Sequence, residues 1–246
     1  MAVVAYIAMI TMNGLANWLP LFGRNTGEVS DRFDSLFTPA PYTFSVWGVI
    51  YLLLAAFVVY QALPRARADE RVARARPLFV LSCLFNIAWL VFWHALAISV
   101  SELLMLGLLL TLITLYLRIG TWREATVGWQ RWVLDVPFAV YLGWISVATI
   151  ANTAIFLVDL GVDAGGAAVA ITIVMIAAAA LLGLLGLMSR RDWAYALVIA
   201  WGLGGVSAAQ SGQTASISIA ALVGAALLAV LALVTAVARS RRAATS

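Results

Sequence analysis

Eight apolar segments separated by short polar stretches dominate this sequence. They cover approximately residues 2–22, 43–63, 77–97, 100–119, 132–158, 165–188, 193–210 and 215–238. Each is close to the roughly 20 residues that a helix needs to cross the hydrocarbon core of a bilayer. With 64% hydrophobic and 11% charged residues, the chain also lies far from the composition of soluble domains. We therefore expect an all-α, polytopic membrane helix bundle with about eight transmembrane helices in a lipid bilayer.

The arginines test this count independently of hydropathy. Thirteen of the 15 fall in the loops after the second, fourth and sixth segments or after the eighth, and the opposite loops hold only Arg24 and Arg32. Because an excess of arginine marks the cytoplasmic side, both termini are expected to be cytoplasmic. The lack of lysine and the abundance of alanine, arginine, valine, leucine and glycine are typical of a GC-rich bacterial genome. We expect a multi-pass protein of the bacterial inner (cytoplasmic) membrane.

Several function classes find little support in the composition. The net charge of +4 is spread over short loops, and nucleic-acid binding favours one basic stripe. One histidine and one cysteine exclude a histidine-based metal cluster and an intrachain disulfide, and no Ser/His/Asp set is evident. His94 is interpreted as an interfacial histidine or a heme ligand, and Asp135 as an ion-pair partner of Arg131 or part of a proton relay. Enzyme chemistry therefore has little support, although it stays open.

Two prolines shape the entry to the second apolar segment. Pro39 and Pro41 fix their own backbone angles and push the preceding residues toward extended geometry, so a stiff, non-helical strap is predicted over residues 37–42. Aromatic residues then follow at three- and four-residue spacing on one helical face, namely Phe44, Trp47 and Tyr51. These rings favour either of two interpretations. They line a slot for a flat ligand beneath the strap, or they form an aromatic belt at the membrane interface.

Asparagines inside the apolar segments indicate faces that avoid lipid. An unpartnered amide in the membrane is costly, so Asn86 and Asn152 are expected to face protein or a cavity, or to contact each other. Asn13 and Asn17 share one face of the first segment, which we expect to point inward. Aromatic and small residues accompany the later amides at helical spacing: Trp89 and Trp93 in the third segment, and Trp144 and Ala148 in the fifth.

These segments resemble the TspO/MBR family of tryptophan-rich sensory proteins, which is related to the mitochondrial translocator protein. The third segment is similar to the family pattern LFxxQLxLNxxWSxLFF at Leu78, Phe79, Asn86, Trp89 and Phe92. The fifth segment is similar to YLxWxxFAxxLN at Tyr141, Leu142, Trp144, Ala148 and Asn152. The strap resembles WxPPxxVFxxVWxxLY through Pro39, Phe44, Trp47 and Tyr51 when one residue is dropped. The resemblance covers roughly residues 1–160.

The resemblance implies a five-helix TspO-like domain over residues 1–160, followed at residues 161–246 by three additional transmembrane helices and a short basic tail. It also implies an external loop above a pocket for flat hydrophobic molecules, of which porphyrins and sterols are the family's usual ligands. No cofactor is required, and the implied ligand is a tetrapyrrole such as protoporphyrin or heme. The residues expected to line the pocket are Phe37, Pro39, Tyr42, Trp47, Tyr51, Asn86, Trp89, Trp93, Trp144, Ala148 and Asn152.

This chain departs from the family pattern at several positions, so the fold carries over better than the ligand. Phe37 stands where the family has a loop tryptophan tied to its porphyrin chemistry, and Ala40 replaces the second proline. Ser82 and Val147 replace a glutamine and a phenylalanine. We favour a membrane receptor or sensor for a flat hydrophobic ligand. A small-molecule transporter or permease and a structural subunit of a membrane complex stay open, as does a homodimer.

Overall fold

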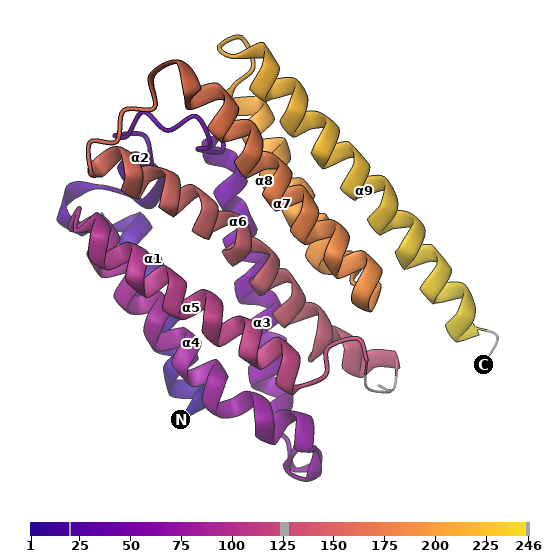
Figure 1. Cartoon of the computed structure of the whole chain (residues 1–246). Coiled ribbons are helices and arrows are strands. Elements are labelled where there is room, and N and C mark those ends of the chain that lie inside the picture. The colour runs from indigo at the N-terminus through magenta and orange to yellow at the C-terminus, as the bar shows by residue number, and fades with distance from the viewer. Residues whose placement is uncertain (20, 124–127, 245–246) are drawn as a thin grey trace.

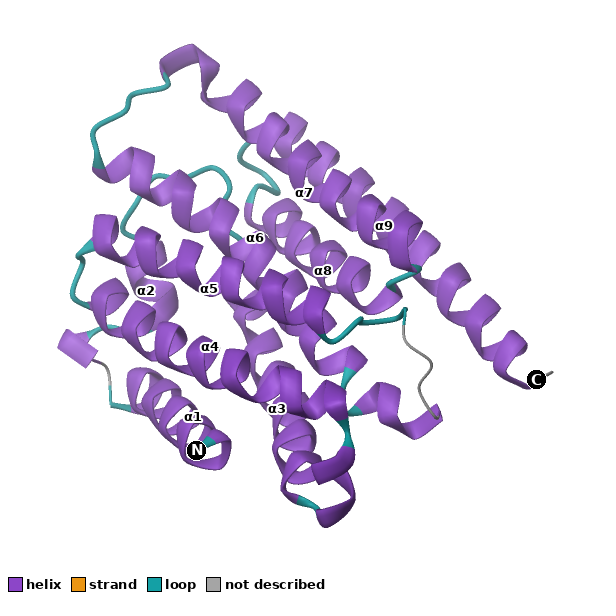
Figure 2. Ribbon diagram, turned by 60° about the horizontal axis from the view of Figure 1, so that its bottom comes forward, coloured by secondary structure: helices purple, strands orange, loops and turns teal. Residues whose placement is uncertain are grey.

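The computed structural model describes residues 1–19, 21–123 and 128–244, and this part of the chain folds into helices without strands (Figures 1 and 2). The eight apolar segments form the eight long helices α1 (Ala2–Trp18), α3 (Val46–Ala62), α4 (Glu70–His94), α5 (Ile98–Arg118), α6 (Asp135–Asp159), α7 (Ala168–Arg190), α8 (Trp193–Ala209) and α9 (Ala215–Ala244). A short helix, α2 (Thr26–Ser30), lies in the loop after α1. The prediction of an all-α polytopic membrane bundle is confirmed.

Six of the described helices are long and apolar enough to cross a membrane, by length and composition. The remaining two long helices, α1 and α8, are apolar but have only 17 residues each, whereas α3 reaches 22 residues together with the 3-10 turn before it. Both pack against longer helices. Helix α1 packs mainly on α4, and α8 packs on α6, α7 and α9. Short 3-10 turns lie beside several of the helices, at Leu21–Gly23, Pro41–Ser45, Pro64–Ala68, Gly128–Trp132 and Gly165–Ala167.

Helix α6 lies at the centre of the bundle, between two groups of helices (Figure 2). Helices α1, α3, α4 and α5 lie on one side, and α7, α8 and α9 on the other. Glycines allow α6 and α8 to approach closely, as is common between membrane helices. A Cβ atom added to Gly143 of α6 would lie 2.9 Å from the carbonyl oxygen of Tyr195, and one added to Gly202 of α8 would lie 2.8 Å from Val147. Helix α8 is therefore packed directly onto α6.

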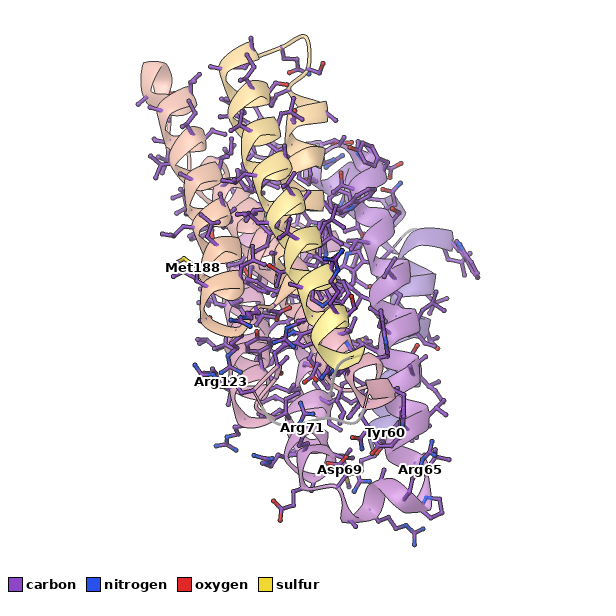
Figure 3. All side chains as sticks on the ribbon, turned by 90° about the vertical axis from the view of Figure 1, so that its right-hand side faces the viewer. Tyr60, Arg65, Asp69, Arg71, Arg123 and Met188 are labelled. Carbon is purple, nitrogen blue, oxygen red and sulfur yellow. The ribbon has the colours of Figure 1, made fainter. Side chains whose placement is uncertain are left out.

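Both chain ends lie at the same end of the bundle, and the strap and α2 lie at the opposite end (Figure 1). Arg65, Arg71 and Arg123 lie toward the end that carries the termini (Figure 3). The structure thus places the two termini and the arginine-rich loops on one side, as the charge pattern predicts.

Helix α4 begins earlier than the sequence predicts. Hydropathy predicts a start at Pro77, but the helix begins at Glu70 because Asp69 caps it, its Oδ1 accepting hydrogen bonds from the backbone nitrogens of Arg71 at 2.9 Å and Val72 at 3.4 Å. Arg71 is consequently buried in the bundle, where its guanidinium donates to Asp135 of α6. An arginine expected in a loop instead joins α4 to α6.

A second buried carboxylate joins α5 to α8 at the arginine-rich end. Asp192 precedes α8 and is fully buried. Its Oδ2 accepts a hydrogen bond of 2.6 Å from the hydroxyl of Tyr116, and its Oδ1 accepts one of 3.0 Å from the backbone nitrogen of Tyr195. Burial raises the pKa of Asp192 from 3.8 to about 6, although these hydrogen bonds act in the opposite direction.

The non-helical part of the strap is shorter than predicted. The sequence predicts a non-helical segment over residues 37–42, but a 3-10 turn already begins at Pro41 and leads into α3. Proline suits the first position of such a turn because its fixed backbone angle is already helical and its missing N–H is not needed there. Below, the strap means residues 36–44.

Candidate functional site

Four aromatic rings from α3 and α4 form a nearly parallel stack beneath the strap. Trp47 stacks on Tyr51 with ring centroids 5.6 Å apart and on Trp89 at 6.3 Å, and Trp89 stacks on Trp93 at 5.9 Å, with interplanar angles of 21–29°. The four-residue spacing within each helix places each pair on one face, and the packing of the helices joins the two pairs. A continuous stack of this kind offers flat surfaces on which a planar molecule could lie.

Two rings from α6 meet this stack edge-on, and a ring from the strap meets one of them. Trp144 and Tyr141 point their rings at Trp47, with centroid distances of 6.3 and 6.1 Å and interplanar angles of 82° and 67°. Phe44 meets Trp144 in the same manner at 5.9 Å and 83°. Stacked and edge-on pairs each contribute about 0.5–1.5 kcal/mol beyond the burial of their area. Trp47 is therefore the centre of the aromatic cluster.

The rings enclose a small cavity, which we name the aromatic chamber. Its lining residues are Thr26, Ser30, Pro39, Phe44, Trp47, Trp89, Trp93, Met105, Trp144, Val147, Ala148, Ala151, Asn152 and Ile155. Its volume is about 30 Å³, roughly the space of one water molecule. Pockets for small molecules usually measure about 300–1,000 Å³. In this structure the aromatic chamber is too small for such a molecule, and a ligand enters only if its walls move.

A polar network closes the chamber at α5 and α6. The Oδ1 of Asn152 accepts hydrogen bonds from Trp89 Nε1 at 3.1 Å and from Ser101 Oγ at 3.3 Å, and its Nδ2 donates to Glu102 at 2.6 Å. Thr153 donates a second hydrogen bond to Glu102 at 2.7 Å. Glu102 is buried, and within the described residues no basic side chain pairs with it. Its two carboxyl oxygens thus accept hydrogen bonds from Asn152 and Thr153.

Asn86 lies outside the chamber. Its side chain is fully buried and accepts a hydrogen bond of 2.8 Å from Asn13 of α1. The expectation that Asn86 and Asn152 avoid lipid agrees with their burial, but the two amides bind different partners and not each other. Asn13 faces inward as expected, whereas the side chain of Asn17 lies outside the described part of the structure.

A larger, lateral cleft lies on the other side of the tryptophan stack. It measures about 550 Å³ and runs between α1, the start of α2, the start of α3 and α4. The cleft and the aromatic chamber share four lining residues: Thr26, Phe44, Trp47 and Trp89. Gly14 and Gly48 line the cleft at open positions, where a Cβ atom added to either glycine would meet nothing within 4 Å. Movement of the shared wall would therefore join the chamber to a space large enough for a ligand.

In addition to Asn86, two residues expected in the pocket lie elsewhere. Phe37 is buried, but it lines a separate cavity of about 420 Å³ formed by the strap, the end of α6 and the start of α7. Tyr42 is half exposed and meets Trp201 of α8 edge-on, with centroids 5.6 Å apart. Neither ring lines the aromatic chamber. The structure brings together there Pro39, Trp47, Trp89, Trp93, Trp144, Ala148 and Asn152, and places Tyr51 next to them on the cleft side.

The chamber also contains residues for which the sequence pattern gives little indication. Thr26 and Ser30 come from α2, and Trp93 Nε1 donates to the backbone oxygen of Thr26 at 3.2 Å. Met105 comes from α5 and Ile155 from α6. Their only sequence signal is helical spacing: Met105 follows Ser101 by four residues, and Ile155 follows Asn152 by three. The two α2 residues carry no such signal because α2 lies in a loop.

His94 does not line the chamber. Its ring is fully buried, with Nδ1 2.7 Å from the carbonyl oxygen of Leu90 and Nε2 3.5 Å from the hydroxyl of Thr26. Arg24 donates to its backbone oxygen at 3.1 Å. Both ring nitrogens thus lie beside polar atoms of the protein, which fits a structural histidine at the end of α4. Among the described residues, no group of three or more potential metal ligands is found.

Comparison with known proteins gives one match. The model of a family described as TSPO-like protein matches residues 1–234 of the chain. The match extends through α7 and α8 and into α9, so it includes most of the three additional helices as well as the five-helix core. No curated protein and no solved structure matches the chain.

Proposed function

Because the chain belongs to the TSPO-like family, we propose that it is an integral membrane receptor or sensor for a flat hydrophobic ligand, a porphyrin or another tetrapyrrole or a sterol-like molecule. The ligand would bind in the aromatic chamber once the wall shared with the lateral cleft has moved. We further propose that the protein lies in the cytoplasmic membrane of a bacterium with both termini in the cytoplasm. The excess of arginine on the side of the termini supports this orientation.

The observation that carries the proposal is the shared wall of Trp47 and Trp89. On one side these rings close a chamber of about 30 Å³, and on the other they face a cleft of about 550 Å³. A planar ligand that slides between stacked rings replaces one aromatic contact by two, each worth about 0.5–1.5 kcal/mol. The hydrogen bonds around Asn152 would keep Trp89 in place while Trp47 moves.

Titration with protoporphyrin IX tests this proposal. Purified protein in lipid nanodiscs is expected to lose tryptophan fluorescence as the porphyrin binds. A Trp89→Leu/Trp144→Leu double variant should bind about 5- to 150-fold more weakly, because it loses two aromatic contacts of about 0.5–1.5 kcal/mol each. The matched control is Trp129→Leu/Trp132→Leu, which keeps the same number of tryptophans but changes two exposed rings outside the chamber.

Two outcomes would overturn the proposal. The first is unchanged fluorescence of the wild-type protein at saturating porphyrin. The second is an equal loss of affinity in both double variants, which would mean that the porphyrin adsorbs elsewhere on the protein.

A further inference from the structure

The strap is attached to α8, one of the helices that follow the five-helix core. Three hydrogen bonds make this connection. The backbone nitrogen of Ala40 donates to the carbonyl oxygen of Gly205 at 3.0 Å. The Nε1 of Trp201 donates to the backbone oxygen of Thr43 at 2.9 Å, and the Nε2 of Gln210 donates to that of Leu36 at 3.1 Å. Among the described residues, these are the hydrogen bonds that join the strap to a helix other than α3, into which it runs.

Close packing at Gly205 adds to these bonds. A Cβ atom at Gly205 would lie only 2.1 Å from Thr43 Oγ1 and 2.9 Å from Thr43 Cβ, so α8 approaches the strap at a distance that only glycine permits. The neighbouring Gly204 is different, because nothing lies within 4 Å of its Cβ position. The close packing of the strap on α8 therefore depends on Gly205 and not on the adjacent Gly204.

The same strap forms part of the aromatic chamber. Pro39 and Phe44 line it, and Phe44 meets Trp144 edge-on. The residues next to them along the strap, Ala40 and Thr43, bind α8. One short segment thus connects α8 to the wall of the chamber.

We propose that Trp201, Gly205 and Gln210 of α8 are positioning residues that hold the strap closed, so that α8 controls entry of the ligand into the aromatic chamber. This inference rests on the proposed function for its ligand, but the attachment itself is independent of any ligand. It gives a role to a helix outside the five-helix core. Loosening α8 from the strap admits the ligand, and restoring the contact retains it.

Amide hydrogen exchange of the strap tests the attachment without a ligand. Gly205→Ala is expected to speed exchange of strap peptides that contain Ala40 and Thr43 about two- to tenfold, because the added methyl group separates the strap from α8 and breaks hydrogen bonds. Gly204→Ala is the matched control and should exchange like the wild type. Equal exchange in the two alanine variants would overturn the proposal.

Two further variants cover the case in which Gly205→Ala does not fold. Gln210→Leu removes the donor to Leu36, and Trp201→Phe removes the donor to Thr43 while keeping an aromatic ring beside Tyr42. Each is expected to speed strap exchange about two- to tenfold, while exchange of α4 peptides stays at the wild-type rate. A positioning role would be contradicted by faster exchange throughout the protein, or by an exchange rate in the strap equal to that of the wild type.

Stopped-flow mixing with protoporphyrin IX tests the consequence for binding. Gln210→Leu should raise the association rate about two- to tenfold relative to the wild type, and Gly204→Ala should leave it unchanged. If no variant binds the porphyrin, the proposed function fails while the exchange experiment still decides the attachment. If the wild type binds and the Gln210→Leu rate is unchanged, the control of entry by α8 is wrong.

Discussion

Replacing Asn152 with alanine is expected to lower the free energy of unfolding by about 2–4 kcal/mol. The amide makes three hydrogen bonds to side chains of α4 and α5, and one of them ends on the buried carboxylate of Glu102. A hydrogen bond to a charged group contributes about 1.5–3 kcal/mol and a neutral one about 0.5–1.5 kcal/mol. Side-chain hydrogen bonds measured between membrane helices average only about 0.6 kcal/mol. Three bonds at this lower value give about 2 kcal/mol, and a bond to Glu102 at the strength of a charged one raises the total to about 4 kcal/mol.

The assay is unfolding by sodium dodecyl sulfate in mixed micelles, followed by tryptophan fluorescence. Thr114→Val is the control, because the hydroxyl of Thr114 is exposed and donates only to Leu110 one turn earlier in its own helix. It should change stability by no more than about 0.5 kcal/mol. A double-mutant cycle of Asn152→Ala with Glu102→Gln should give a coupling of about 1 kcal/mol or more. A loss below about 1 kcal/mol for Asn152→Ala, or no coupling, would refute the assigned network.

Two further predictions concern the arginine-rich end. Since burial raises the pKa of Asp192 to about 6, the native carboxyl keeps its proton where the unfolded chain has lost it, so stability should fall by up to about 3 kcal/mol as the pH rises from about 4 to 6. Unfolding titrations across this pH range should show a smaller fall in stability for Asp192→Asn than for the wild type. An identical fall would contradict the raised pKa of Asp192. Arg71→Met should lower the free energy of unfolding by about 3–5 kcal/mol, because Asp135 loses this buried partner. Arg71→Met/Asp135→Leu should recover most of the loss in the same titration, and no recovery would argue against the pairing.

The number and type of the long helices can be predicted from the sequence because two independent physical signals agree. Apolar length marks each helix, and the arginine pattern fixes its alternation. The predicted start of α4 is wrong because Pro77, a typical helix boundary, lies inside the helix here. The cap at Asp69 and the burial of Arg71 against α6 stabilise the turns before it, and neither is visible in hydropathy.

Helical spacing predicts the candidate site better than the loop pattern does. Trp47, Trp89 and Trp144 converge because each lies on a face defined by three- and four-residue steps. No such periodicity fixes the directions of Phe37 and Tyr42 in the strap, and both point away from the chamber. Whether the chamber binds a ligand stays a prediction.

Long-range contacts cannot be predicted from local patterns for a different reason. The partner of Asn86 can be found only by knowing that α1 packs on α4, and the partner of the strap only by knowing that α8 packs on α6. The hydrogen bonds between strap and α8 join residues 158 and 174 positions apart. Nothing local in Gln210 or Gly205 indicates them.

That separation has a consequence for biosynthesis. The ribosome makes the strap early and α8 late, and at roughly 5–20 residues per second the interval for about 160 residues is on the order of 10–30 seconds. Trp144 of α6 is made only about 100 residues after the strap, so it is during roughly the last 60 residues of this interval, about 3–12 seconds, that the tryptophans of α3, α4 and α6 can assemble while the strap above them has no anchor. The nascent protein therefore passes through a stage in which its central aromatic cluster is complete and uncovered, and only the arrival of α8 ends it.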